Sequence, residues 1–119
     1  MNKIQKFEDL NVWKESIKLS VNYLQGIEKF KDFGLQDQIH RSAVSIPSNI
    51  SEGFDMKGNK EFIQFFYIAK GSYSELRTQL YIAIETGTID KSIGKDFIDN
   101  SKMVYAMFYK LIQVRREKF

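Results

Sequence analysis

An apolar stripe that recurs every three or four residues between positions 62 and 83 constrains the fold most strongly. Its members are Phe62, Phe66, Ala69, Tyr73, Leu76, Leu80 and Ala83. This spacing is the period of one face of an α-helix, whereas a strand would place alternate residues on one face. We therefore expect a helix from about Asn59, as its N-cap, to Thr86, where Gly87 ends it. Such a helix is roughly 40 Å long, and its apolar face needs other helices to cover it.

Three further segments have the same period. They run from about Asp9 to Phe30, from about Gln36 to Met56, and onward from about Asp90. We expect Asp9 to cap the first, and Gly34 to end it in a left-handed conformation. The stripe of the first segment is Val12, Trp13, Ile17, Ser20, Leu24 and Ile27. That of the second is Leu35, Ile39, Ala43, Ile46, Ile50 and Phe54. That of the last is Ile93, Phe97, Val104, Met107, Leu111 and Val114.

The segments are joined by links of only about three to six residues, which make consecutive helices antiparallel neighbours. Turn formers are scarce, with 7 Gly and 1 Pro in 119 residues, which disfavours a fold of many strands and hairpins. The sequence therefore predicts an all-α, up-down-up-down four-helix bundle in which residues 1–119 form a single domain.

Several classes of protein are disfavoured by composition. The chain has no cysteine, so disulfides, thiolate metal sites and cysteine nucleophiles are excluded. The first residues do not form the apolar core of a signal peptide, and no run of 18 apolar residues occurs. We expect a cytoplasmic protein without membrane contact. The single histidine, His40, is expected at a surface or interface, and no glycine-rich phosphate loop is present. We therefore expect no enzyme activity, no metal and no cofactor.

Pro47 interrupts the apolar period of the second segment. A proline inside a helix removes one N–H donor and crowds the carbonyl four residues earlier, here that of Ala43, at a cost of about 3 kcal/mol. We expect the second helix to be kinked or broken at Pro47. The serines around the proline are small enough for another backbone to come close, and their hydroxyls can bond to the carbonyls that the proline frees.

Polar residues form a row on each of the two middle helices. Two carboxylates, Glu52 and Glu75, could suggest a metal site, but bundles that bind two irons also require Glu-x-x-His elements, which are missing here. We interpret the rows as hydrogen-bonding positions between helices or subunits, where Arg41 or Arg77 could pair with a carboxylate. The candidate residues are Arg41, Ser45, Pro47, Asn49, Glu52, Gly71, Ser72, Glu75 and Gln79.

The third and fourth helices carry apolar residues beyond the one stripe that a bundle needs. On the third helix these are Ile63, Tyr67, Ile68 and Ile82, and on the fourth they are Ile98, Tyr105, Phe108, Tyr109 and Ile112. This excess predicts self-association. The alternative is that single apolar residues on a surface are normal in proteins.

The formal net charge of +3 comes entirely from the last segment, where residues 90–119 hold 7 basic and 4 acidic side chains. A basic end is a candidate nucleic-acid surface. Cations in the last turns of a helix also stabilise its dipole, and this plainer reading stays open. The candidate nucleic-acid-binding residues are Lys102, Lys110, Arg115, Arg116 and Lys118.

Three stretches of the sequence resemble a known family: FEDLNVWKES near the start, QIHRSAVSIPSNISEG at 38–53, and FIQFFYIAKGSYSELRTQL at 62–80. They resemble the four-helix bundle proteins encoded in intervening sequences of bacterial 23S rRNA genes. The run R-x-A-V-S-I-P-x-N-I-x-E-G, from Arg41 to Gly53, carries most of the likeness. Ser48 and Ser51 replace alanines that are frequent in the family, and Gln36 stands where a Ser or Thr cap is common.

The resemblance implies a homopentameric ring in which the segments quoted above lie near subunit contacts. The chain is also similar to the accessory bundle protein of diversity-generating retroelements, which implies a basic ring surface for nucleic acid and a reverse transcriptase as partner. Our leading hypothesis is a non-enzymatic, self-assembling ring that binds RNA or DNA. The alternative is a protein-interaction adaptor that holds a partner through Tyr and Phe side chains and binds no nucleic acid.

Overall fold

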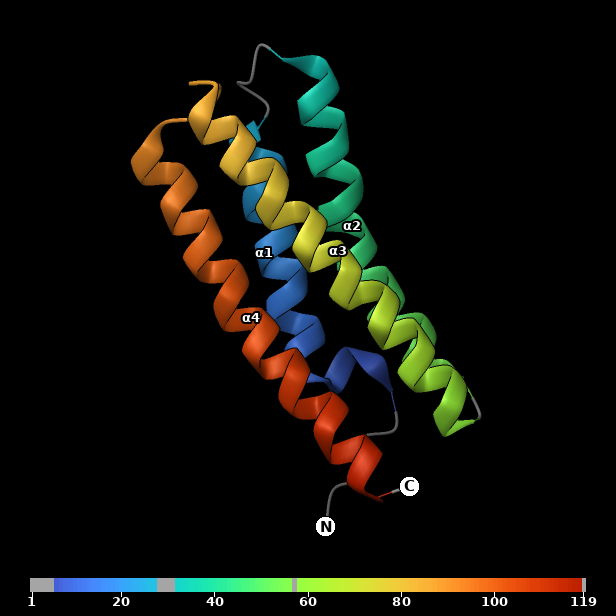
Figure 1. The fold of residues 1–119 in the computed structure, drawn as a ribbon. Helices are drawn as coiled ribbons and strands as arrows, with labels where there is room; N and C mark the ends of the chain where they lie inside the picture. Colours follow the sequence, from blue (N-terminus) through green and yellow to red (C-terminus); the bar gives the residue numbers. More distant parts are fainter. Residues whose placement is uncertain (1–5, 28–31, 57, 119) are drawn as a thin grey trace.

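The computed structural model describes residues 6–27, 32–56 and 58–118, except for the side chains of residue 27 and residues 114–118. A short 3-10 helix, η1 (Phe7–Asp9), precedes four α-helices. These are α1 (Asn11–Ile27), α2 (Phe33–Asp55), α3 (Asn59–Glu85) and α4 (Lys91–Lys118). Successive helices run in opposite directions (Figure 1).

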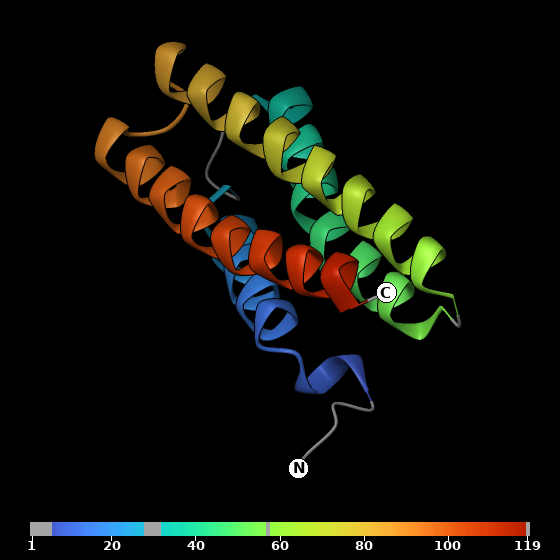
Figure 2. The same ribbon diagram turned by 60° about the horizontal axis from the view of Figure 1, so that its bottom comes forward.

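Each helix packs against two others, so the four helices surround one core. Helix α1 contacts α2 and α4, and α3 contacts α2 and α4. The molecule measures 47 × 23 × 20 Å along its principal axes, and its long axis follows the helices (Figure 2). The predicted four-helix bundle is confirmed, and the described residues are helical apart from their connections.

The predicted stripe of α3 is confirmed at every position, since all seven of its side chains are buried. Gly87 lies just beyond the end of α3, as predicted, and adopts a left-handed conformation with φ of +72°. The start of the helix differs from the prediction, because Asn59 is its first residue and Gly58 occupies the N-cap position.

The starts of α1 and α2 also differ from the prediction. The carboxylate of Asp32 accepts a hydrogen bond from the backbone N–H of Leu35 at 3.0 Å, so α2 begins at Phe33 instead of Gln36. Gly34 therefore lies inside α2, and its expected role as the left-handed end of α1 is wrong. Asp9 ends η1 and does not cap α1, which begins two residues later.

Helix α2 continues through Pro47 from Phe33 to Asp55, so a break at the proline is excluded, whereas a kink stays a prediction. The carbonyl of Ala43, which would accept from residue 47 in an ordinary helix, accepts a hydrogen bond from the Ser20 hydroxyl of α1 at 2.6 Å. We expected a local serine to serve this carbonyl. The nearby Ser48 hydroxyl donates to the carbonyl of Val44 instead, at 2.8 Å.

The predicted stripe of α4 is confirmed in part, because Phe97, Met107 and Leu111 are half-buried and pack against the core. Ile93 is 48% exposed, whereas Ile98, Phe108 and Ile112, which we placed outside the main stripe, are buried. Val104 is buried as predicted, and Val114 lies outside the described side chains. Two apolar stripes lie side by side on this helix, and the position of a glycine determines which of them faces the core. A Cβ on Gly94 would lie 2.5 Å from Cγ1 of Ile84, so the face with this glycine must turn inward against α3.

Two phenols lie in the core and bond to groups on other helices. The hydroxyl of Tyr23 donates to the carbonyl of Phe97, and the hydroxyls of Tyr73 and Ser16 are 3.2 Å apart. Burial raises the pKa of Tyr23 and of Tyr73 well above the ordinary 10.0. Both tyrosines therefore stay protonated in the folded protein at pH values where a solvated phenol ionises.

The bond between Ser20 and Ala43 predicts a specific coupling with Pro47. We expect Ser20→Ala to lower the free energy of unfolding by about 1–3 kcal/mol, because the buried carbonyl loses its donor. In a Pro47→Ala background the loss should be smaller, since residue 47 then supplies an N–H to the same carbonyl. The coupling is measured by urea unfolding of the wild type, the two single variants and the double variant, all at one protein concentration. Equal losses in both backgrounds would contradict it, and Ser48→Ala, which removes an exposed hydroxyl, is the control.

The buried phenols predict a loss of stability in alkali. Above about pH 10 the unfolded chain releases these two protons and the folded chain keeps them, so the free energy of unfolding falls as pH rises. Each tyrosine contributes a slope of up to about 1.4 kcal/mol per pH unit. Urea unfolding between pH 9 and 11 should therefore give a shallower slope for Tyr73→Phe. The control Tyr81→Phe, which changes an exposed phenol, should keep the wild-type slope.

Candidate functional site

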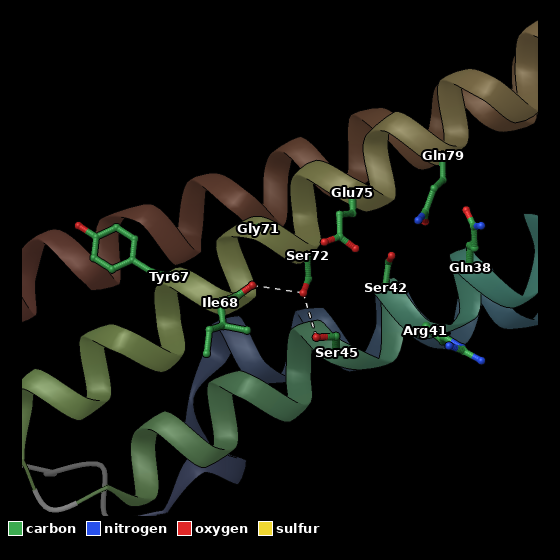
Figure 3. Close-up of a pocket in the computed structure, with 10 residues that line it drawn as sticks. All are labelled: Gln38, Arg41, Ser42, Ser45, Tyr67, Ile68, Gly71, Ser72, Glu75 and Gln79. Atoms are coloured by element: carbon green, nitrogen blue, oxygen red, sulfur yellow. Dashed lines mark hydrogen bonds between the residues drawn. The ribbon is translucent and has the colours of Figure 1, made fainter.

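An open groove of about 670 Å³ lies between α2 and α3. We call it the α2–α3 groove, and Figure 3 shows its side chains. Ten residues line it: Gln38, Arg41, Ser42, Ser45, Tyr67, Ile68, Gly71, Ser72, Glu75 and Gln79. Most of the polar residues predicted for helix contacts are therefore brought together here. Pro47, Asn49 and Glu52, which we grouped with them, do not line this groove.

A pair of hydroxyl groups joins the two walls of the α2–α3 groove, and an amide of α2 supports it. The hydroxyls of Ser45 and Ser72 are 2.9 Å apart and connect α2 to α3 (Figure 3). Nδ2 of Asn49 donates to Oγ of Ser45 at 2.9 Å and to the Ser45 carbonyl at 2.8 Å. Asn49 therefore holds the Ser45 side chain within α2, and Ser45 in turn hydrogen-bonds to Ser72 of α3.

The four charged residues that were candidates for pairing, Arg41, Arg77, Glu52 and Glu75, form no ion pair with one another in the described part of the chain. Arg41 pairs with Asp37 of its own helix at 3.2 Å, and both side chains are mostly exposed, so this pair contributes little stability. The Arg77 guanidinium lies 5.7 Å from the centre of the Tyr105 ring. Glu52 and Glu75 are exposed. Pairing of these groups between subunits stays a prediction.

One polar atom in the α2–α3 groove has unsatisfied hydrogen-bonding capacity. Oε1 of Gln79 is buried and has no hydrogen-bond partner. Figure 3 shows the Gln79 side chain directed toward α2, near Ser42 and Gln38. A buried acceptor without a donor costs about 1–3 kcal/mol, so this end of the groove favours a ligand or partner that can donate a hydrogen bond.

The outer face of α3 carries large apolar side chains on both sides of a small centre. We call this surface the α3 row and define it as Tyr67, Ile68, Gly71, Tyr81 and Ile82. Its four side chains are 44–53% exposed. A Cβ on Gly71 would have no atom within 4 Å. The predicted excess of apolar surface is thus confirmed for Tyr67, Ile68 and Ile82, whereas Ile63 is half-buried.

A second groove, of about 400 Å³, lies between α1 and α2, and sequence reasoning missed it. We call it the α1–α2 groove. Its lining is Phe7, Trp13, Ile17, Ser20, Val21, Leu24, Val44, Pro47, Ser48 and Ser51. None of these residues is charged, although 28% of the chain is charged. Among the residues predicted for contacts, Pro47 belongs to this groove and not to the α2–α3 groove.

Helix α4 carries the predicted basic residues. Lys102 and Lys110 are exposed on it. Arg115, Arg116 and Lys118 fall within the bounds of α4, but their side chains lie outside the described part of the structure. The structure therefore places two of the five predicted nucleic-acid-binding side chains on the surface.

Other kinds of site find little support. Within the described residues, no three side chains of the types His, Cys, Asp or Glu gather in a way that could hold a metal ion. His40 is exposed, as predicted for a surface histidine. No helix in the described part of the chain has the length and apolarity needed to cross a membrane.

Comparison with known proteins identifies the family. The family model described as "23S rRNA-intervening sequence protein" matches residues 8–110, which is most of the chain. The chain belongs to the 23S rRNA-intervening sequence protein family. A crystal structure of a protein of unknown function from the S23 ribosomal protein family of Bacteroides thetaiotaomicron is similar, with a TM-score of 0.81. The two chains are 24% identical over 85% of this chain and 97% of the other, and this likeness shows the fold alone. No curated protein matches.

Much of the sequence by which this chain resembles the 23S rRNA-intervening sequence family has a role inside the single chain. Ala43 and Ile50 are fully buried, and the Ala43 carbonyl binds Ser20. A Cβ on Gly53 would lie 2.9 Å from Cβ of Phe65, so α2 and α3 approach closely there. Intramolecular packing thus accounts for these positions without a subunit contact. The exposed positions of the run, such as Arg41, Val44 and Glu52, are accessible for a contact with another subunit.

Gly71 carries the clearest prediction for this member of the 23S rRNA-intervening sequence family. A glycine inside an exposed helix costs about 1 kcal/mol relative to alanine, and no other described part of the chain comes within 4 Å of where its Cβ would lie. We expect Gly71→Leu to keep the fold, since the space around it is open, but to weaken association by blocking close approach to the α3 backbone. Light scattering measures the mass. An unchanged mass would contradict close approach, and Ala106→Leu, at an exposed position of α4, is the matched control.

Proposed function

We propose that this protein is a non-catalytic, self-assembling helical bundle whose assembly, a homopentameric ring, presents a basic surface to RNA. One observation carries the proposal: the α3 row leaves four large apolar side chains 44–53% exposed around a glycine with open space. Exposed apolar clusters of this kind mark sites of protein contact. The pentamer itself is supported by the resemblance to ring-forming bundles.

The location of charge supports RNA as a ligand. Residues 90–119 hold 7 basic and 4 acidic side chains, and the rest of the chain is balanced at 11 of each. A subunit charge of +3 becomes about +15 in a fivefold ring, and a concentrated positive field attracts phosphates strongly. The proposed binding residues are Lys102, Lys110, Arg115, Arg116 and Lys118. Binding of this type depends on phosphate contacts and shows little sequence preference.

A role without catalysis is supported by the side chains in the grooves. The chain has no cysteine and one histidine, which is exposed, and the hydroxyls of Ser45 and Ser72 pair with each other. A cytoplasmic location and a bend of α2 at Pro47 belong to the same proposal. The bend is supported by the Ala43 carbonyl, which bonds to Ser20 and not along its own helix.

A filter-binding titration of RNA at several salt concentrations tests the proposal. We expect retention to fall steeply with salt, with a slope of roughly 0.7 per phosphate contacted for single strands. Reversing two charges with Lys102→Glu and Lys110→Glu should reduce both the affinity and the slope. The matched control is Lys91→Glu with Lys95→Glu, which makes the same charge change at exposed positions near the other end of α4.

A flat response to salt, or equal losses in the two double variants, would contradict RNA binding through this end of α4. If assembly persists and RNA is not retained, the adaptor function is favoured, with Tyr109, which is exposed outside the α3 row, as a contact residue. Under that function, Arg115→Glu with Arg116→Glu leaves capture of a protein partner, such as a nucleic-acid-processing enzyme, unchanged.

A further inference from the structure

The two charged residues that line the α2–α3 groove are not equivalent. Arg41 is paired with Asp37 of its own helix at 3.2 Å, and Figure 3 shows its side chain directed away from α3. Glu75 is directed from α3 toward α2 in the same view, and it has no ion pair among the described residues. The charge that lacks a counter-charge in this groove is therefore negative, which favours a cation as ligand.

The two hydroxyls that join the walls of the α2–α3 groove already use their protons. The Ser72 hydroxyl donates to the carbonyl of Ile68 at 3.2 Å, so the hydrogen in the 2.9 Å contact between Ser45 and Ser72 belongs to Ser45. The side-chain amide of Asn49 donates to the Ser45 hydroxyl in turn, at 2.9 Å. Each hydroxyl oxygen keeps a lone pair. These hydroxyls can therefore accept a hydrogen bond from a ligand but cannot donate one.

Gln79 adds a further acceptor one helical turn beyond Glu75. Its Oε1 is buried and has no hydrogen-bond partner, whereas the residue as a whole is half-buried. The last torsion of a glutamine side chain is soft, so the amide can turn its oxygen into the groove without movement of α3. Ser72, Glu75 and Gln79 are spaced by three and four residues, so their acceptors lie along one line of the helix.

This line of acceptors suits a guanidinium group better than an ammonium group. A guanidinium is planar and carries five N–H donors in a fixed fork, whereas an ammonium is a compact charge with three donors. Two donors of the fork can bind the Glu75 carboxylate side by side. The Cβ atoms of residues four apart on a helix are about 5–6 Å from each other, so the remaining donors can reach the amide oxygen of Gln79.

The other end of the α2–α3 groove disfavours a second positive charge on the ligand. Tyr67 lines this end, and Nζ of Lys70 lies 5.9 Å from the centre of the Tyr67 ring. A polyamine long enough to follow the groove from Gln79 would place an ammonium group near Lys70, and like charges repel. The groove therefore favours a ligand with a single cationic group.

We infer that the α2–α3 groove binds a small molecule that carries one guanidinium group. Glu75 and Gln79 hold the guanidinium, and the Ser72 hydroxyl supplies a third acceptor. This site goes beyond the proposed function, because its ligand is a cation and not a polyanion. It also lies apart from Lys102 and Lys110, which belong to α4, and it requires no second copy of the chain.

Saturation-transfer difference NMR with methylguanidinium as the probe tests the site, because this method detects weak binding to a single chain and to an assembly alike. We expect methylguanidinium to bind several times more tightly than methylammonium, which lacks the planar fork, and methylurea, which lacks the charge. Glu75→Gln should weaken binding by about tenfold, because it removes the charge from both hydrogen bonds. The matched control Glu85→Gln, which removes the same charge at an exposed position of α3 outside the groove, should keep the wild-type affinity.

Gln79→Met separates a binding role from a structural one. The substitution removes the buried oxygen and keeps the length of the side chain, so it should raise the urea midpoint and weaken methylguanidinium binding several-fold. Unchanged affinity in Glu75→Gln or in Gln79→Met, or equal affinity for methylguanidinium and methylammonium, would overturn the inference. The Lys102→Glu with Lys110→Glu variant should bind methylguanidinium as the wild type does, so a failure of RNA binding and a failure of this site are distinct results.

Discussion

The hydrogen bond from Ser20 to the carbonyl of Ala43, 2.6 Å long, connects the local chemistry of α2 to the assembly of the bundle. Pro47 lacks the N–H that this carbonyl would otherwise accept. A carbonyl without a donor in the protein interior is costly, so α2 reaches its low-energy state only when α1 lies against it. The proline therefore makes the second helix dependent on the first, and it fixes which residue of α1 faces which residue of α2.

This docking also determines the two grooves. Ser20 places the outer side of α1 beside Val44 and Pro47, which leaves the α1–α2 groove lined by uncharged residues. On the other side of α2, Ser45 meets Ser72 at 2.9 Å and forms the wall of the α2–α3 groove. The stretch of α2 around Ala43 and Ser45 thus contacts both α1 and α3. Its small side chains allow both neighbouring helices to come close.

The buried face of a helix was predicted most accurately where the sequence contains only one apolar stripe. The stripe of α3 has a single period and small residues at Ala69 and Ala83, so its buried face could be assigned in full. On α4 two apolar stripes differ by one position, and the choice depends on contacts such as that between Gly94 and Ile84, which no local pattern reveals. The hydroxyl of Ser20, which donates to the Ala43 carbonyl, is 23 residues away in sequence, so a local pattern does not reveal this bond. The α2–α3 groove was predictable from its polar rows, but the α1–α2 groove depends on α1 lying beside Pro47.

Under the proposed function, contact between copies and binding of RNA depend on different forces. Burial of apolar area drives contact between copies and is insensitive to moderate salt, whereas attraction to phosphates weakens as salt rises. The α3 row, to which the proposed function assigns assembly, lies on α3, whereas Lys102 and Lys110 lie on α4. Because these helices face different sides of the bundle, copies can gather without covering their own positive charge. In the proposed assembly the field at the basic ends would grow with the number of copies, and added salt would release RNA while the assembly persists.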